Sequence, residues 1–147
     1  MRAVIRTLCL AIASVAVFSS CNKDDDKSSS KTKLLTSGTW KIILAEEKEN
    51  GGAWEDVTDI QFAPCTQDDR LKFSEPNVIT SDEGATKCDP SDPQTQTGTW
   101  AFVSNGQGID LDGELYDIDE LNGHTFKISY TETFGGESYS YRLTFVH

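Results

Sequence analysis

Basic residues, histidines and nucleophile motifs are scarce in this chain of 147 residues, and each shortage excludes a class of function. The 13 Lys and Arg residues face 24 Asp and Glu residues, giving a formal net charge of −11. Nucleic-acid binding is excluded, because it needs a basic patch and the densest basic set lies between Lys23 and Lys33. The only histidines, His124 and His147, are interpreted as exposed residues rather than general bases. With no Gly-x-Ser-x-Gly motif either, we expect no enzyme activity.

Long apolar runs are also missing. The longest, Leu8 to Phe18, is shorter than the roughly 20 residues that a membrane-spanning helix needs, and it has the length of the apolar region of a secretory signal peptide. Small residues follow it, so we predict a signal peptide over residues 1–20. Arg2 and Arg6 would leave with that peptide, and 11 basic residues would then face 24 acidic ones, a net charge of −13. Such a surface keeps a protein soluble beside other acidic surfaces.

The residues around the predicted cleavage point carry a second signal. Val17-Phe18-Ser19-Ser20-Cys21 resembles the lipobox of bacterial lipoproteins, which implies that Cys21 becomes a lipidated amino terminus. Asn22-Lys23-Asp24-Asp25-Asp26 resembles the signal by which some Gram-negative bacteria export lipoproteins to the outer face of the outer membrane. The same run is typical of a solvated linker extended by its like charges. We therefore expect a tether over residues 21–33 and a lipid anchor in the outer membrane, with both the cell-surface and the periplasmic face left open.

Two cysteines, Cys65 and Cys88, fall in the remaining segment, 34–147, which has the length of one domain. A turn predicted at Glu75-Pro76-Asn77 lies midway between them, with Cys65 11 positions before Pro76 and Cys88 11 positions after Asn77. Two strands that reverse there would bring the thiols together, and an oxidising compartment favours a disulfide. A metal pair, the alternative, would need nearby His or further Cys. We predict the disulfide, with no metal and no cofactor.

Apolar residues recur at every second position in seven runs, as expected for strands with one buried face. These alternating sets are Trp40, Ile42 and Leu44; Leu71 and Phe73; Trp100 and Phe102; Ile109 and Leu111; Tyr116 and Ile118; Phe126, Ile128 and Tyr130; and Tyr139, Tyr141, Leu143 and Phe145. Short turn signals between the runs favour consecutive antiparallel hairpins. We therefore predict an all-β domain, an up-and-down antiparallel barrel of about eight strands with one disulfide and a short N-terminal helical turn within 31–36. A two-sheet sandwich is the alternative.

Three segments together carry a family resemblance. Gly38-Thr39-Trp40, the block from Cys65-Thr66-Gln67-Asp68-Asp69 to Cys88, and Gly98-Thr99-Trp100 resemble the lipocalin-like domain family of bacterial lipoproteins, over roughly residues 34–147. The resemblance implies a calycin-type barrel that is closed at one end near Gly38 and Trp40 and open at the other to a small apolar ligand. It also implies that Arg142 packs over Trp40 in a cation–π contact. An outward-facing, solvated Arg142 is the alternative.

The number of large inward-facing rings limits the space for a ligand. Each ring removes about 150–250 Å² from water and fills the corresponding volume, so we expect a shallow pocket with an aromatic rim. The candidate lining residues are Trp100, Phe102, Tyr116, Phe126, Tyr130, Tyr139 and Tyr141. The predicted function is that of a membrane-anchored lipoprotein that binds a small apolar or amphipathic ligand. The alternative is a non-catalytic structural or interaction accessory with a filled barrel, whose partner is another envelope protein.

Overall fold

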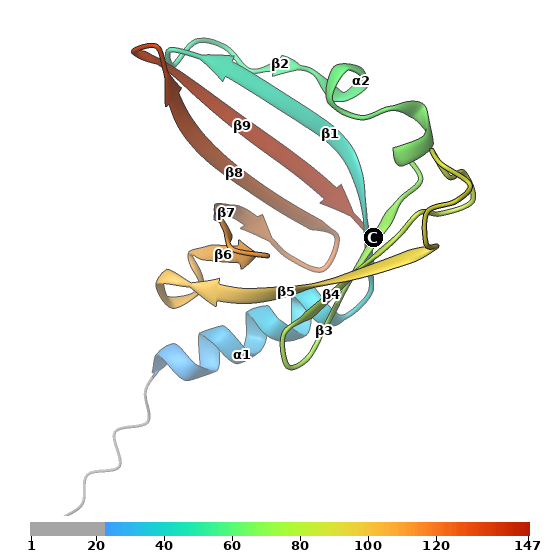
Figure 1. Cartoon of the computed structure of the whole chain (residues 1–147). Coiled ribbons are helices and arrows are strands. Elements are labelled where there is room, and N and C mark those ends of the chain that lie inside the picture. Colours follow the sequence, from blue (N-terminus) through green and yellow to red (C-terminus); the bar gives the residue numbers. More distant parts are fainter. Residues whose placement is uncertain (1–22) are drawn as a thin grey trace, which may run out of the picture.

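The computed structural model describes residues 23–147, with side chains from residue 29, and forms a closed antiparallel barrel (Figure 1). Each barrel strand pairs with the next one along the chain, and β1 pairs with β9 to close the cylinder. The eight barrel strands are β1 (Thr39–Glu49), β3 (Arg70–Ser74), β4 (Val78–Asp82), β5 (Thr95–Val103), β6 (Gly108–Leu111), β7 (Glu114–Leu121), β8 (Thr125–Phe134) and β9 (Glu137–Val146). The predicted all-β class and up-and-down barrel are confirmed.

Strand β1 is paired along most of one edge but only at a few residues of the other. One edge pairs with β9 from Lys41 to Glu49, whereas β3 pairs with the other edge only at Thr39 and Trp40. Further along that second edge, the two-residue strand β2 (Glu55–Asp56) pairs with β1. The connection between β1 and β3 therefore covers the part of the barrel wall where these two strands separate.

That connection contains two short helices, α2 (Thr58–Gln61) and η1 (Pro64–Thr66). Helix α2 is held against β1 because Val57 N donates a hydrogen bond to Ala45 O, and Ala45 N donates one to Thr58 Oγ1, both over 2.9 Å. At the other end of the connection, the predicted disulfide is confirmed: Cys65 and Cys88 are bonded, with their Cα atoms 5.2 Å apart. The disulfide ties this connection to the one between β4 and β5.

Helix α1 (Lys23–Thr36) closes one end of the barrel (Figure 1). Leu35 is fully buried, and its carbonyl oxygen accepts a hydrogen bond from Trp40 Nε1 over 2.8 Å. The Lys31 ammonium group donates a hydrogen bond to the carbonyl of Gly106, in η2 (Ser104–Gly106) between β5 and β6. The helix therefore begins well before the predicted turn within 31–36. Most of the segment predicted as an extended tether, residues 21–33, is therefore helical, and Lys31 within it contacts the barrel.

Aromatic rings fill the half of the barrel next to α1. Phe73 contacts Trp100 and Phe126 edge to face, with ring centroids 5.8 Å apart in both pairs. Trp40 packs on Phe126 at 5.7 Å, and Trp40, Phe73 and Phe126 are all fully buried. Pairs of this geometry contribute about 0.5–1.5 kcal/mol each beyond the burial of their area. This end of the cylinder is a packed core without room for a ligand.

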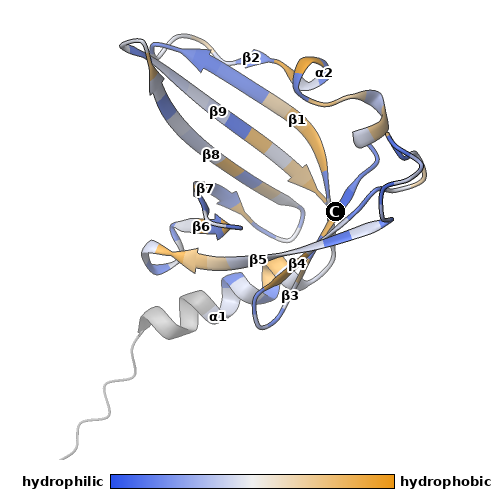
Figure 2. Cartoon of the chain, in the orientation of Figure 1, coloured by the Kyte–Doolittle hydropathy of each residue, from blue (hydrophilic) through white to orange (hydrophobic). Residues whose placement is uncertain are grey.

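The predicted alternation is wrong at one point on β1. A β-bulge between Ile42 and Leu44 shifts the register with β9, so Leu44 lies opposite Thr144 and Ala45 lies opposite Leu143. Ala45 consequently takes the inward position, with only 1% of its surface exposed, and Leu44 leaves the inner face. Beyond the bulge β1 becomes hydrophilic, and Figure 2 shows this change from its apolar half near α1 to its polar half at the open end.

Candidate ligand-binding cavity

Two adjoining spaces lie inside the barrel toward its open end, and the side chains of Phe62 and Leu143 line both. The aspartate chamber has a volume of about 280 Å³ and is lined by Ile42, Phe62, Thr66, Asp69, Leu71, Ser81, Leu143 and Phe145. The tyrosine chamber has a volume of about 170 Å³ and is lined by Ala45, Val57, Gln61, Phe62, Tyr116, Tyr130, Tyr141 and Leu143. Their combined size is that of a small binding site rather than a spacious cup.

The walls of the aspartate chamber are mostly apolar, with one carboxyl group among them. Asp69 Oδ1 is buried and accepts no hydrogen bond from any residue that the structure describes. Burial raises the pKa of Asp69 above its ordinary value, and the nearby carboxylates of Glu83, Asp68 and Asp82 raise this pKa further. A buried acceptor without a donor is costly, so a donor-bearing ligand would be stabilised here.

Three tyrosine rings from neighbouring strands form one side of the tyrosine chamber. Tyr130 stacks on Tyr141 with ring centroids 4.9 Å apart, and Tyr116 meets Tyr130 edge to face at 5.5 Å. The Tyr116 hydroxyl donates a 2.7 Å hydrogen bond to Glu114. Burial raises the pKa of Tyr116, and this hydrogen bond raises it further. Burial also raises the pKa values of Tyr130 and Tyr141, with smaller contributions from nearby glutamates.

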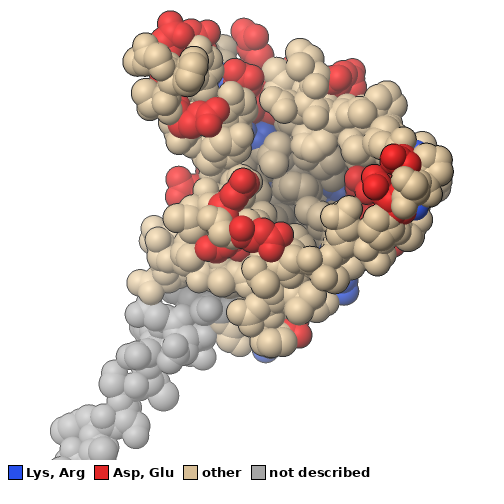
Figure 3. Space-filling view, viewed as in Figure 1, with Lys and Arg blue, Asp and Glu red and all other residues tan. Residues whose placement is uncertain are grey.

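Acidic residues surround the open end. The Tyr139 hydroxyl donates a 2.8 Å hydrogen bond to Glu137, which raises the pKa of Tyr139 to about 12. Glu47 contributes to the raised pKa values of Tyr130, Tyr139 and Tyr141, which places its negative charge near all three hydroxyls. Figure 3 shows this face of the molecule hollowed, with acidic side chains on both sides of the hollow. The open end therefore has a negative potential that would repel anions and attract cations.

A larger hollow of about 440 Å³ lies on the outer face of the barrel, over β7, β8, β9 and β1. Its polar side chains largely bind one another: Ser129 donates to Asp119 over 3.0 Å, and the Thr131 and Ser140 hydroxyls are 2.9 Å apart. Arg142 belongs to this surface, where it donates two 2.8 Å hydrogen bonds to Glu46. Because its polar groups are already paired, we assign the ligand site to the interior chambers despite the larger outer volume.

Arg142 lies on the outer surface of the barrel, against Trp54. Its guanidinium lies 4.1 Å from the ring centroid of Trp54, rather than over Trp40 as the resemblance implied, and it is not a freely solvated side chain either. Arg142 is adjacent in sequence to the inward-facing Leu143, and successive side chains of a strand point to opposite faces. This places it on the outside of the barrel.

His147 takes the place over Trp40 instead. The ring centroids of His147 and Trp40 are 3.8 Å apart, and His147 Nδ1 lies 3.1 Å from the carbonyl oxygen of Thr39. A Cβ atom on Gly38 would lie 2.5 Å from His147 Nδ1, so any larger residue at position 38 would displace the imidazole from this position. Trp40 lies at the end of the barrel next to α1, and its histidine partner is one that sequence reasoning missed.

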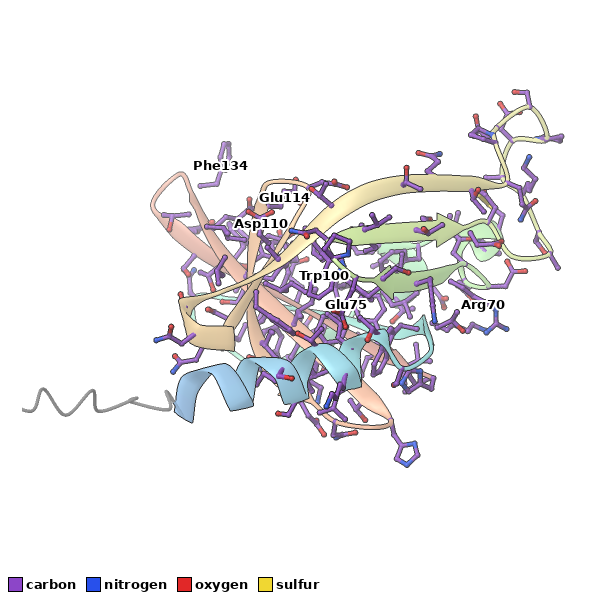
Figure 4. The ribbon with its side chains drawn as sticks, turned by 90° about the horizontal axis from the view of Figure 1, so that it is seen from below. Arg70, Glu75, Trp100, Asp110, Glu114 and Phe134 are labelled. Carbon is purple, nitrogen blue, oxygen red and sulfur yellow. A yellow bond between two sulfur atoms is a disulfide. The ribbon has the colours of Figure 1, made fainter. Side chains whose placement is uncertain are left out.

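The predicted lining residues divide into three groups. Tyr116, Tyr130 and Tyr141 line the tyrosine chamber. Tyr139 lies at the rim with Glu137. The remaining three, Trp100, Phe102 and Phe126, pack in the core cluster, and Trp100 is at the centre of the molecule in Figure 4, whereas Phe134 projects from the β8–β9 hairpin. Cys21 lies outside the described residues.

Phe62 and Asp69 are the functional candidates that sequence reasoning missed. Both belong to the connection between β1 and β3, where short helices replace the alternating pattern of strands. An isolated apolar residue at position 62, next to the cysteine-framed block, was the available signal for Phe62. Nothing in the sequence distinguishes Asp69 from the adjacent Asp68, which has the same side chain. The structure separates them, because Asp68 Oδ2 accepts hydrogen bonds from Ala85 N and Thr86 N.

The carboxylates of Asp110 and Asp112 both accept backbone hydrogen bonds: Gly113 N in the β6–β7 turn donates to Asp110, and Thr99 N of β5 donates to Asp112. Within residues 23–147, no cluster of His, Cys, Asp and Glu is arranged to hold a metal ion. No helix in the same part of the chain is long and apolar enough to cross a membrane. A comparison with protein-family models gave no match, and a search of curated proteins gave none either.

Proposed function

We propose that this protein is a membrane-anchored lipoprotein whose barrel binds a small apolar or amphipathic ligand without catalysing a reaction. One observation carries the proposal: the packed aromatic core does not fill the barrel, and the two adjoining chambers lie beside it. Small-molecule sites are typically concave and mostly apolar with a few placed polar groups. The aspartate chamber, with apolar walls around Asp69, Thr66 and Ser81, matches this description.

The proposed lipid anchor determines the orientation of the barrel. Cys21 stands two positions before the first residue of α1, Lys23, and α1 packs on the closed end through Leu35 and Lys31. A lipid at Cys21 would therefore leave the open end free to face the surrounding medium of the envelope. A Cys21→Ala variant should no longer incorporate labelled palmitate. It should also move from the outer-membrane fraction into the soluble fraction. Unchanged labelling would refute the anchor without bearing on the ligand.

Ligand binding is tested by filling the chambers with a side chain. Leu143 lines both chambers, so Leu143→Trp should abolish the fluorescence increase of the uncharged apolar dye N-phenylnaphthylamine. The matched control is Leu115→Trp, because Leu115 is 64% exposed and the same change there should leave dye binding intact. Circular dichroism and a thermal melt verify that both variants fold. Equal dye binding by both variants would contradict an interior site, and no dye binding by the unmodified protein would favour the structural accessory function.

A further inference from the structure

We propose that the aspartate chamber selects a small amphipathic amine, with its ammonium group bound by the carboxylate of Asp69 and its apolar chain lying along Phe62 and Leu143. This inference rests on the proposed function, which it narrows from any apolar or amphipathic ligand to a cationic one.

One carboxyl oxygen of Asp69 is unsatisfied within the described part of the chain. Asp69 Oδ1 is buried, and no described residue donates a hydrogen bond to it. Five of the chamber's walls are apolar side chains, those of Ile42, Phe62, Leu71, Leu143 and Phe145. A carboxylate in such surroundings needs a donor of its own, and an ammonium group supplies both N–H donors and the opposite charge.

The charges around the aspartate chamber are mostly negative. Glu83, Asp68 and Asp82 lie close enough to Asp69 to raise its pKa, and Glu47 lies near the tyrosine hydroxyls on the other side. Arg70 is exposed, and its charge acts on Asp82. These carboxylates would repel an anionic ligand and stabilise an ammonium ion.

The two chambers share apolar wall residues. Phe62 and Leu143 line both chambers, so an apolar chain can extend from Asp69 toward the rings of Tyr116, Tyr130 and Tyr141. Tyrosine rings tolerate both apolar contact and a nearby cation. Thr66 and Ser81 provide hydroxyl groups beside Asp69 that could accept the remaining ammonium hydrogens.

The test compares three ligands with the same chain length and different charge: octylamine, octanol and octanoate, titrated calorimetrically below their aggregation limits. Octylamine should bind at least about tenfold more tightly than octanol, because a hydrogen bond to a charged group is worth more than a neutral one. Octanoate should bind more weakly than octanol. Equal binding of all three, or tightest binding of octanoate, would overturn the selection of amines and leave the proposed function intact. If none of the three binds, the proposed function fails as well.

Two variants assign the selectivity to Asp69. Asp69→Asn keeps the shape and removes the charge, so it should lose the preference for octylamine while octanol still binds. Asp117→Asn is the matched control, because Asp117 is exposed on β7 and the same change in net charge should preserve the preference. A preference that persists in Asp69→Asn would overturn the assignment. Should Asp69→Asn fail to fold by circular dichroism, the comparison of ligands on the unmodified protein still decides the proposal.

Discussion

The role of α1 can be tested by removing one buried side chain from it. Leu35 is fully buried against the closed end of the barrel, and its carbonyl binds Trp40 Nε1. Leu35→Ala removes the side chain but keeps this backbone hydrogen bond and a residue that favours helix. A buried Leu→Ala change costs about 2–5 kcal/mol, through lost burial and the cavity that remains. We expect a loss of about 3 kcal/mol.

Leu34→Ala is the matched control for this experiment. Leu34 is the adjacent residue of the same helix and is only partly buried, so the identical substitution should cost about 1 kcal/mol or less. Urea denaturation followed by tryptophan fluorescence measures both variants. With a urea slope of about 1–3 kcal/mol/M, the midpoint for Leu35→Ala should fall by roughly 1–3 M. If Leu35→Ala and Leu34→Ala both stay within about 0.5 kcal/mol of the unmodified protein, α1 is a tether rather than part of the barrel.

Three further predictions concern the disulfide, the outer surface and the tyrosines. Reducing Cys65–Cys88, which closes a separation of 23 positions, should lower the free energy of unfolding by about 3 kcal/mol in denaturation with and without reductant; no change would contradict this. Arg142→Met should lower the free energy of unfolding by about 1–3 kcal/mol, because it leaves the largely buried Glu46 carboxylate without its two hydrogen bonds. A variant that is as stable as the unmodified protein in urea denaturation would show that the ion pair contributes nothing to stability. All four tyrosines have raised pKa values, that of Tyr139 to about 12, so the folded protein retains phenolic protons that the unfolded chain releases. Stability should therefore fall as the pH rises above about 10, and the phenolate absorbance of the folded protein should appear at higher pH than that of the unfolded chain; coincident titrations would refute this.

The strands could be predicted from the sequence because burial on one face imposes a visible period of two. In β8, Phe126 and Ile128 are buried, whereas the alternate residues Lys127 and Ser129 point outward. The disulfide could be predicted for a related reason, since a turn midway between two cysteines brings them together. The bulge at Leu44 could not, because Leu44 and Ala45 are both acceptable on an inner face and only the register with β9 chooses between them.

Only the tyrosines of the candidate site could be predicted from the sequence. Tyr116, Tyr130 and Tyr141 belong to regular strands, so their inward direction followed from the alternation. Phe62 and Asp69 lie in the connection between β1 and β3, whose position depends on contacts with distant residues rather than on local periodicity. The buried environment of Asp69 arises only when that connection closes over the separation between β1 and β3.

The location of a bound ligand can be measured by nuclear magnetic resonance of the isotope-labelled protein during titration with octylamine. We predict that the shifted signals cluster at Phe62, Asp69 and Leu143, the residues of the two interior chambers. Shifts concentrated at Trp54 and Ser140 on the outer surface, or no shifts at all, would contradict an interior binding site.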